Sequence, residues 1–273
     1  MRDPNIEREY KQRVASGFNQ AASGYDSPSL RAFVTGADRL VELAELQSGQ
    51  KVLDVGAGTG NAALAAARVV EPAGQVIGIE IAADMREVAR QKIQAMGLSN
   101  VEIQEGDAAA PPFGDNRFDA VICASAIYTL PDIQTAVQEW RRVLKPGGRV
   151  AFSSLGTGKD RLYYNLLQKY GIPLPPVMPL QRVNTPEKCG DLLRETGFEE
   201  IAVHAEQLGY YLPQAEQCWD LVWNTGARIP LQYLPPQALE QFKAEYLAAM
   251  AASATDQGIW IDWPGIFALG RKP

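Results

Sequence analysis

The stretch best suited to chemistry is a cluster of three glycines, Gly56, Gly58 and Gly60, directly after an apolar run that ends at Val55. Glycines permit a tight turn and let a ligand approach the backbone, and a helix that starts after the turn offers free N–H groups. A dinucleotide motif G-x-G-x-x-G would need a glycine where the chain has Asn61, and a P-loop would need a lysine that the turn lacks. The spacing G-x-G-x-G therefore indicates a different ligand.

Two acidic residues lie where later apolar runs end. Glu80 ends the run over 75–79, and Asp107 follows the run over 101–104. A carboxylate at the end of the second strand can accept hydrogen bonds from both hydroxyls of a ribose. Parallel sheets bind ligands at the carboxyl ends of their strands, so we expect the glycine turn and both carboxylates at one site.

Strands and helices alternate through the first half of the chain. Residues 61–70 and 84–96 have helical spacing, and a helix over 133–144 is expected to end at the turn formers of 145–148. A β-α-β order implies a parallel sheet covered by helices. Five strands are predicted in this part, over 52–55, 75–79, 101–104, 118–123 and 149–153.

Both ends of the chain add further elements. Residues 1–45 predict helix, turn and helix, and the proline-dense stretch 171–186 predicts an extended loop or the edge of a lid. The remaining residues predict a helix over 186–195, a strand over 200–206, helices broken by prolines over 214–250, and a last strand over 266–270.

The composition limits the class of protein. The 26 Lys and Arg against 32 Asp and Glu give a net charge of −6, which argues against a nucleic-acid partner. Three separated cysteines and a single histidine argue against a metal site and a disulfide framework, and so favour a reducing compartment. The sequence shows neither a signal-peptide pattern nor an apolar run of membrane-spanning length, so we expect a cytoplasmic protein that does not contact membranes.

The motifs also occur in a known order. With the strand over 118–123 and the helix-to-strand segment 140–148 that follow, they resemble the motifs of class I S-adenosylmethionine-dependent methyltransferases, near the ubiquinone and menaquinone biosynthesis branch. The resemblance is good over 18–154 and poor in the last third. It implies a Rossmann-like α/β fold, a seven-stranded, mostly parallel sheet with its last strand antiparallel, flanked by helices. An N-terminal helical segment and a C-terminal helical cap would be added to this fold.

The resemblance implies S-adenosyl-L-methionine as cofactor, with the glycine turn near its methionine part, Glu80 at the ribose and Asp107 at the adenine. An N-terminal tyrosine can close over the cofactor in this family. The residues expected to bind it are Tyr25, Asp54, Gly56, Ala57, Gly58, Gly60, Glu80, Ile81, Met85, Asp107, Ala108 and Ala124.

The chain is interpreted as one methyltransferase domain over 1–273. Its parts would be N-terminal helices (1–47), a cofactor-binding core (48–155) and a substrate-side half (156–273). A cap over about 210–262 would hold many of the aromatic residues. These aromatics could form a core, or they could line an apolar acceptor pocket.

The expected reaction is methyl transfer to an O, N or C nucleophile of a small, apolar or aromatic molecule. Alignment of the reacting groups would supply most of the catalysis, without a metal. No general base is assigned. Weak candidates are Tyr128, which stands where many relatives have histidine, and His204. A homo-oligomer is possible. The alternatives are a non-catalytic module that binds the cofactor or its demethylated product, and a protein or RNA methyltransferase.

Overall fold

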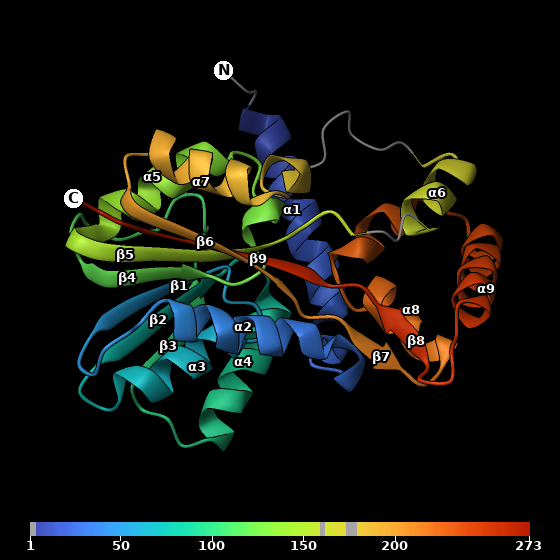
Figure 1. The fold of residues 1–273 in the computed structure, drawn as a ribbon, viewed down its shortest axis with the longest axis horizontal. Helices are drawn as coiled ribbons and strands as arrows, with labels where there is room; N and C mark the ends of the chain where they lie inside the picture. The colour runs from blue at the N-terminus through green and yellow to red at the C-terminus, as the bar shows by residue number, and fades with distance from the viewer. Residues whose placement is uncertain (1–3, 159–161, 173–178) are drawn as a thin grey trace.

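A seven-stranded sheet forms the centre of the molecule (Figure 1). The computed structural model describes residues 4–158, 162–172 and 179–273. The strand order is β3-β2-β1-β4-β5-β9-β6, in which β1 to β5 run parallel and β9 is antiparallel to both neighbours. This is the predicted Rossmann-like sheet, and its strands are β1 Lys51–Val55, β2 Gln75–Glu80, β3 Val101–Glu105, β4 Phe118–Cys123, β5 Leu144–Leu155, β6 Glu199–Gln207 and β9 Pro264–Arg271.

Helices cover both faces of the sheet, as Figure 1 shows. One face packs against α5 and α7 around the fully buried Trp140 and Phe152. The other face packs against α2, α3 and α4 and is lined by small residues of α3, such as Ala63 and Ala66. Because both faces are buried, the central strands are almost continuously apolar. These helices are α2 Arg31–Leu43, α3 Asn61–Val70, α4 Ala83–Ala95, α5 Ile133–Val143 and α7 Pro186–Glu195.

The helix that was expected to end at the turn formers of 145–148 ends one residue earlier than predicted. The helix ends at Val143, and Lys145-Pro146-Gly147-Gly148 form the irregular start of β5. Gly147 adopts a φ of 76° there, and its amide donates to the carbonyl oxygen of Lys272. Leu144 pairs with Phe118 and Arg149 pairs with Ala120, so the register of β4 and β5 shifts across 145–148 and this segment bulges from the ladder.

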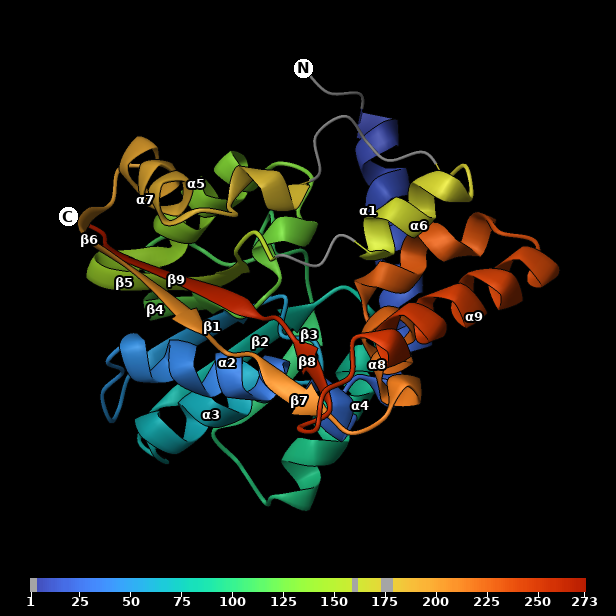
Figure 2. The same cartoon turned by 45° about the vertical axis from the view of Figure 1, so that its right-hand side comes forward.

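Further helices lie at one end of the sheet (Figure 2). At the N-terminus the predicted helix, turn and helix are present, and α1 stands between the strand ends and the later helices. The chain between β6 and β9 forms two helices, a 3-10 segment and a small two-stranded sheet that the sequence did not predict. These elements are α1 Pro4–Ala21, η1 Ala22–Gly24, η2 Pro28–Leu30, α6 Leu162–Lys169, β7 Tyr210–Leu212, α8 Ala215–Trp223, η5 Gly226–Tyr233, α9 Pro236–Ala252 and β8 Ile259–Ile261.

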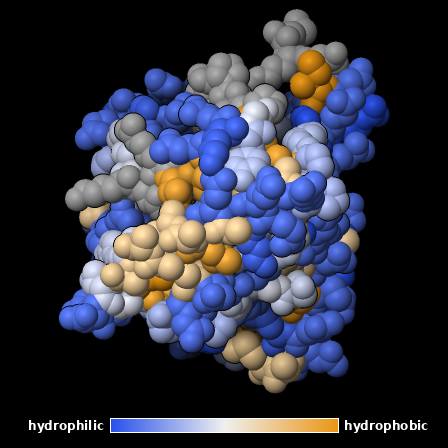
Figure 3. Space-filling view, turned by 90° about the vertical axis from the view of Figure 1, so that its right-hand side faces the viewer, coloured by the Kyte–Doolittle hydropathy of each residue, from blue (hydrophilic) through white to orange (hydrophobic). Residues whose placement is uncertain are grey.

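The added C-terminal elements have their own apolar core. Trp219 stacks on Trp223 with ring centroids 5.8 Å apart, and it also meets the edges of Phe242 and Tyr246. Figure 3 views this end of the molecule, where a mildly apolar area lies among hydrophilic side chains. The proline-dense stretch lies partly outside the described residues, because 173–178 are not described; its last part forms η4 Pro179–Arg182.

Candidate active site

A cavity that is partly open to solvent lies at the carboxyl ends of β1 to β4. Its walls come from the glycine turn, from the ends of β2, β3 and β4, and from α1 and the turn that follows α1. The lining residues are Tyr10, Lys11, Val14, Phe18, Tyr25, Gly56, Gly58, Glu80, Ile81, Met85, Asp107, Ala108, Ala124, Ser125, Ala126, Thr129, Leu130 and Pro131.

The glycine turn lines the cavity with backbone atoms, because Gly56 and Gly58 have no side chains. The Gly56 amide donates to the Ile79 carbonyl oxygen over 2.9 Å, which ties the turn to β2. Gly56 has a φ of 71°, and a Cβ there would come within 2.6 Å of the Ala126 methyl group. Gly58 has a φ of 55° and faces open space, and Gly60 has a φ of 85° just before α3. Left-handed backbone favours glycine at all three positions.

Glu80 forms the next part of the wall. One carboxylate oxygen accepts the Gly58 amide at 3.0 Å, and the other accepts the Ala82 amide at 2.8 Å. Burial raises the pKa of Glu80, although backbone amides and the Arg86 guanidinium oppose this shift. Each carboxylate oxygen has two lone pairs, so both can accept a further hydrogen bond from a ligand. The side chain therefore supports the glycine turn and offers two acceptors at one point.

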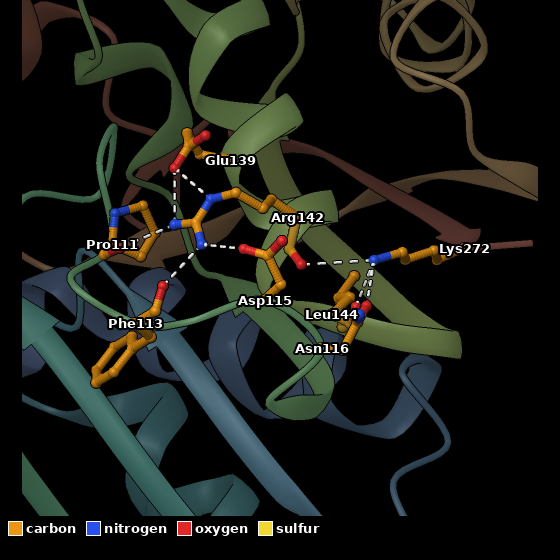
Figure 4. A network of polar contacts seen from close by, with 8 residues as sticks. All are labelled: Pro111, Phe113, Asp115, Asn116, Glu139, Arg142, Leu144 and Lys272. Carbon is orange, nitrogen blue, oxygen red and sulfur yellow. Dashed lines mark hydrogen bonds and ion pairs between the residues drawn. The ribbon is translucent and has the colours of Figure 1, made fainter.

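Asp107 lies at the start of a loop that is fixed from behind. Its Oδ1 accepts the Ala109 amide at 2.8 Å, and the carbonyl oxygen of Ala108 accepts the Trp140 indole N–H at 2.7 Å. Figure 4 shows how the following residues are held by Arg142, which donates to the carbonyl oxygens of Pro111 and Phe113 and pairs with Asp115 and Glu139. The loop is thereby held against α5.

Asp54 lies beneath the glycine turn and does not line the cavity. It is fully buried, and neither carboxylate oxygen has a hydrogen-bond partner of normal geometry among the described residues. Burial raises its pKa to about 7, which the Ala63 amide offsets only in part. Ala57 and Gly60 also lie outside the lining. They shape the turn, since the Gly60 amide donates to the Ala57 carbonyl oxygen.

The N-terminal segment closes the cavity from the other side. Tyr25 is packed edge-on against Phe18 and at 5.0 Å from the Phe33 ring. Next to it, Asp26 accepts hydrogen bonds from Thr59 and Asn61 and forms an ion pair with Lys92 of α4. The N-terminal turn is thus bonded directly to the glycine motif.

The comparisons with known proteins decide the family. The chain is 33% identical over 222 residues to a demethylmenaquinone methyltransferase of Geobacillus kaustophilus, a match that covers 73% of this chain and 94% of that protein. The chain belongs to the class I S-adenosylmethionine-dependent methyltransferases. A family model described as a methyltransferase domain matches residues 52–148 of this methyltransferase. Nocamycin O-methyltransferase of Saccharothrix syringae is 26% identical over 270 residues, covering 93% of this chain and 96% of that enzyme.

Solved structures agree on the fold. A methyltransferase structure from Bacillus halodurans has a TM-score of 0.62 at 25% identity and covers 88% of this chain and 99% of its own. A S-adenosylmethionine-dependent methyltransferase from Aquifex aeolicus has a TM-score of 0.55 at 18% identity, with full coverage of both chains, and supports the fold alone. Membership of the family makes S-adenosylmethionine the enzyme's cofactor.

The cavity of the methyltransferase fits that cofactor. The glycine turn offers backbone without side chains, Glu80 offers two buried acceptors for a diol, and Asp107 lies at the next strand end. Of the expected binding residues, the cavity brings together Tyr25, Gly56, Gly58, Glu80, Ile81, Met85, Asp107, Ala108 and Ala124. The lining residues that were not among those expected are Tyr10, Lys11, Val14, Phe18, Ser125, Ala126, Thr129, Leu130 and Pro131.

Neither weak base candidate lines the cavity. His204 is exposed in β6 at the edge of the sheet, where it pairs with Phe267 of β9. Tyr128 lies just behind the lining residues Ala126 and Thr129 and is partly buried in the core. Burial raises the pKa of Tyr128, so its hydroxyl is neutral.

Residues 210–262 provide none of the described lining residues. Tyr210, Trp219, Phe242 and Tyr246 belong to the separate C-terminal core, whereas Tyr211, Tyr233 and Trp260 are exposed. Within the described ranges, no three His, Cys, Asp or Glu residues gather as metal ligands. In the same ranges, no helix has both the length and the apolar character needed to cross a membrane.

Proposed function

We propose that this methyltransferase methylates an oxygen or carbon nucleophile of a small, apolar or aromatic molecule. The observation that carries the proposal is the row of polar anchors at neighbouring strand ends: the glycine turn, Glu80 and Asp107. In this proposal Gly56 and Gly58 cradle the methionine part of the cofactor, Glu80 holds the ribose and Asp107 holds the adenine. When bound, the cofactor supplies a methyl group on a positively charged sulfur.

The remaining lining supports an uncharged or anionic acceptor. Beyond the anchors, the described lining is largely apolar, with Phe18, Ala126 and Leu130 among its members. Glu80 and Asp107 are the carboxylates of that lining, and the proposal assigns both to the cofactor. An ammonium acceptor would be left without a partner, and an unpaired charge in such a site is costly. Oxygen and carbon acceptors avoid that cost.

The names of the relatives fit this acceptor class. They include nocamycin O-methyltransferase, aklanonic acid methyltransferase and demethylmenaquinone methyltransferase. The match to the first covers 93% of this chain, and the match to the second covers 53%. The chemistry common to these names is a small organic acceptor.

Positioning supplies most of the proposed catalysis. Burial raises the pKa of Tyr25 and of Tyr128, so both hydroxyls stay protonated and neither provides a phenolate to act as a base. An acceptor that ionises by itself needs only alignment with the methyl group and exclusion of water. Alignment of this kind can contribute on the order of 7–11 kcal/mol in favourable intramolecular reactions.

The test is a transfer assay with methyl-labelled S-adenosylmethionine and three acceptor panels: phenols and quinols, 1,3-dicarbonyl carbon acids, and amines. We expect labelled product from the first or second panel. Turnover of amines alone would refute the acceptor class.

Calorimetry with S-adenosylhomocysteine tests the binding residues. Glu80→Gln is expected to bind roughly 10- to 100-fold more weakly, because hydrogen bonds to a charged group contribute ~1.5–3 kcal/mol. Glu102→Gln, which changes an exposed carboxylate of β3, is the matched control.

A further inference from the structure

One wall of the cavity is a single face of α1. Tyr10, Val14 and Phe18 all line the cavity, and their spacing of four residues places them on one side of the helix. Lys11 lies next to this row and also lines the cavity. Figure 2 shows α1 as a separate helix beside the strand ends, and its residues form one wall of the cavity.

The two halves of α1 are held differently. In the C-terminal half, Gly17 lies directly against Ile229, and Asn19 and Gln20 accept hydrogen bonds from the Asp84 amide and from Arg228. These contacts fix that half to α4 and η5. Among the described residues, the N-terminal half has one close polar contact to the strand ends, the ion pair between Lys11 and Asp107. Its Nζ–Oδ2 distance is 2.7 Å.

The partner of Lys11 is the carboxylate assigned to the adenine. Asp107 already uses Oδ1 to accept the Ala109 amide, and Lys11 occupies Oδ2. A ligand amine that donates to Oδ2 must share this oxygen with the ammonium group or displace it. Lys11 has a second partner in Glu7, one helical turn earlier, so it stays paired after leaving Asp107.

We propose that the Lys11–Asp107 ion pair holds the N-terminal half of α1 over the cavity and competes with the cofactor for Asp107. Lys11 is thus a residue that sets cofactor affinity without being a catalytic residue. This inference rests on the proposed cofactor site. Both side chains are partly exposed, at 25% and 31%, so the ion pair is of modest strength.

The test compares Lys11→Met with Arg8→Met in the full chain. Methionine keeps the length of the side chain and favours helix, and Arg8 is an exposed cation in the same part of α1. Calorimetry with S-adenosylhomocysteine is expected to show about two- to fivefold tighter binding for Lys11→Met and no change for Arg8→Met. Hydrogen exchange of the ligand-free protein should become faster over residues 5–13 of Lys11→Met and stay unchanged over 17–21.

The outcomes separate this inference from the site itself. If S-adenosylhomocysteine does not bind the wild-type protein, the cofactor site fails and the inference fails with it. If wild type binds and Lys11→Met binds equally or more weakly, competition is refuted while the site stands. Unchanged exchange over 5–13 would refute the role of the ion pair in holding α1.

Discussion

Asp54 should make the protein less stable as the pH rises from mildly acidic to neutral. The carboxyl group is fully buried beneath the glycine turn, and burial raises its pKa from 3.8 to about 7 in the folded protein. In the unfolded chain it ionises near its usual value. Its contribution to stability is therefore complete below about pH 4 and is lost as the pH rises to about 7. At ~1.4 kcal/mol per pH unit, the loss amounts to about 4 kcal/mol.

The variant Asp54→Asn removes this titration while keeping the shape of the side chain. We expect the difference in free energy of unfolding between wild type and Asp54→Asn to fall by about 2 kcal/mol between pH 5.5 and 8.5. Urea unfolding at several pH values measures it. The exposed Asp256→Asn is the matched control and should give a constant difference. A constant difference for Asp54→Asn as well would refute the account of Asp54 as a buried, poorly solvated carboxyl group.

Four other substitutions test the glycine turn, the loop after β3 and the absence of a tyrosine base. Gly58→Ala should lower the free energy of unfolding by only about 1 kcal/mol but weaken S-adenosylhomocysteine binding at least roughly tenfold. Gly56→Ala should lower the free energy of unfolding by about 2–4 kcal/mol, because its Cβ would meet the Ala126 methyl group at 2.6 Å. Equal binding by Gly58→Ala and wild type in calorimetry would contradict this. Trp140→Phe leaves the buried Ala108 carbonyl oxygen without the indole N–H that it accepts. Urea unfolding should show a free energy of unfolding lower by about 1–3 kcal/mol. A loss well under this range would mean that another donor replaces the indole. Tyr128→Phe should keep turnover within a few-fold in the transfer assay, since losing a general base would cost roughly 10²–10⁴-fold.

The sheet and most of the cofactor wall could be predicted from the sequence because each depends on local patterns. Short apolar runs gave the strands, and the glycines and acidic residues stand directly at their ends. Glu80 and Asp107 needed no knowledge of packing, since parallel strands bring their carboxyl ends to one edge. The interpretation of the chain as one domain with a cap over 210–262 stays a prediction.

The features that were missed depend on contacts between distant segments. The row of Tyr10, Val14 and Phe18 is visible as a helical stripe, but the sequence does not say which surface it meets. The residue types of 145–148 favour a turn, but they do not reveal that β5 begins before this segment, at Leu144, which pairs with Phe118. Strands β7 and β8 have three residues each, too few to show a periodicity.

The bonds made by Asp26 constrain how the enzyme can be recombined with its relatives. This one carboxylate joins the N-terminal turn to Thr59 and Asn61 of the glycine motif and to Lys92 of α4. A chimera that takes the first thirty or so residues from one parent and the sheet from another would separate these four positions. Exchange of N-terminal segments between homologues therefore has to transfer residues 26, 59, 61 and 92 as one set.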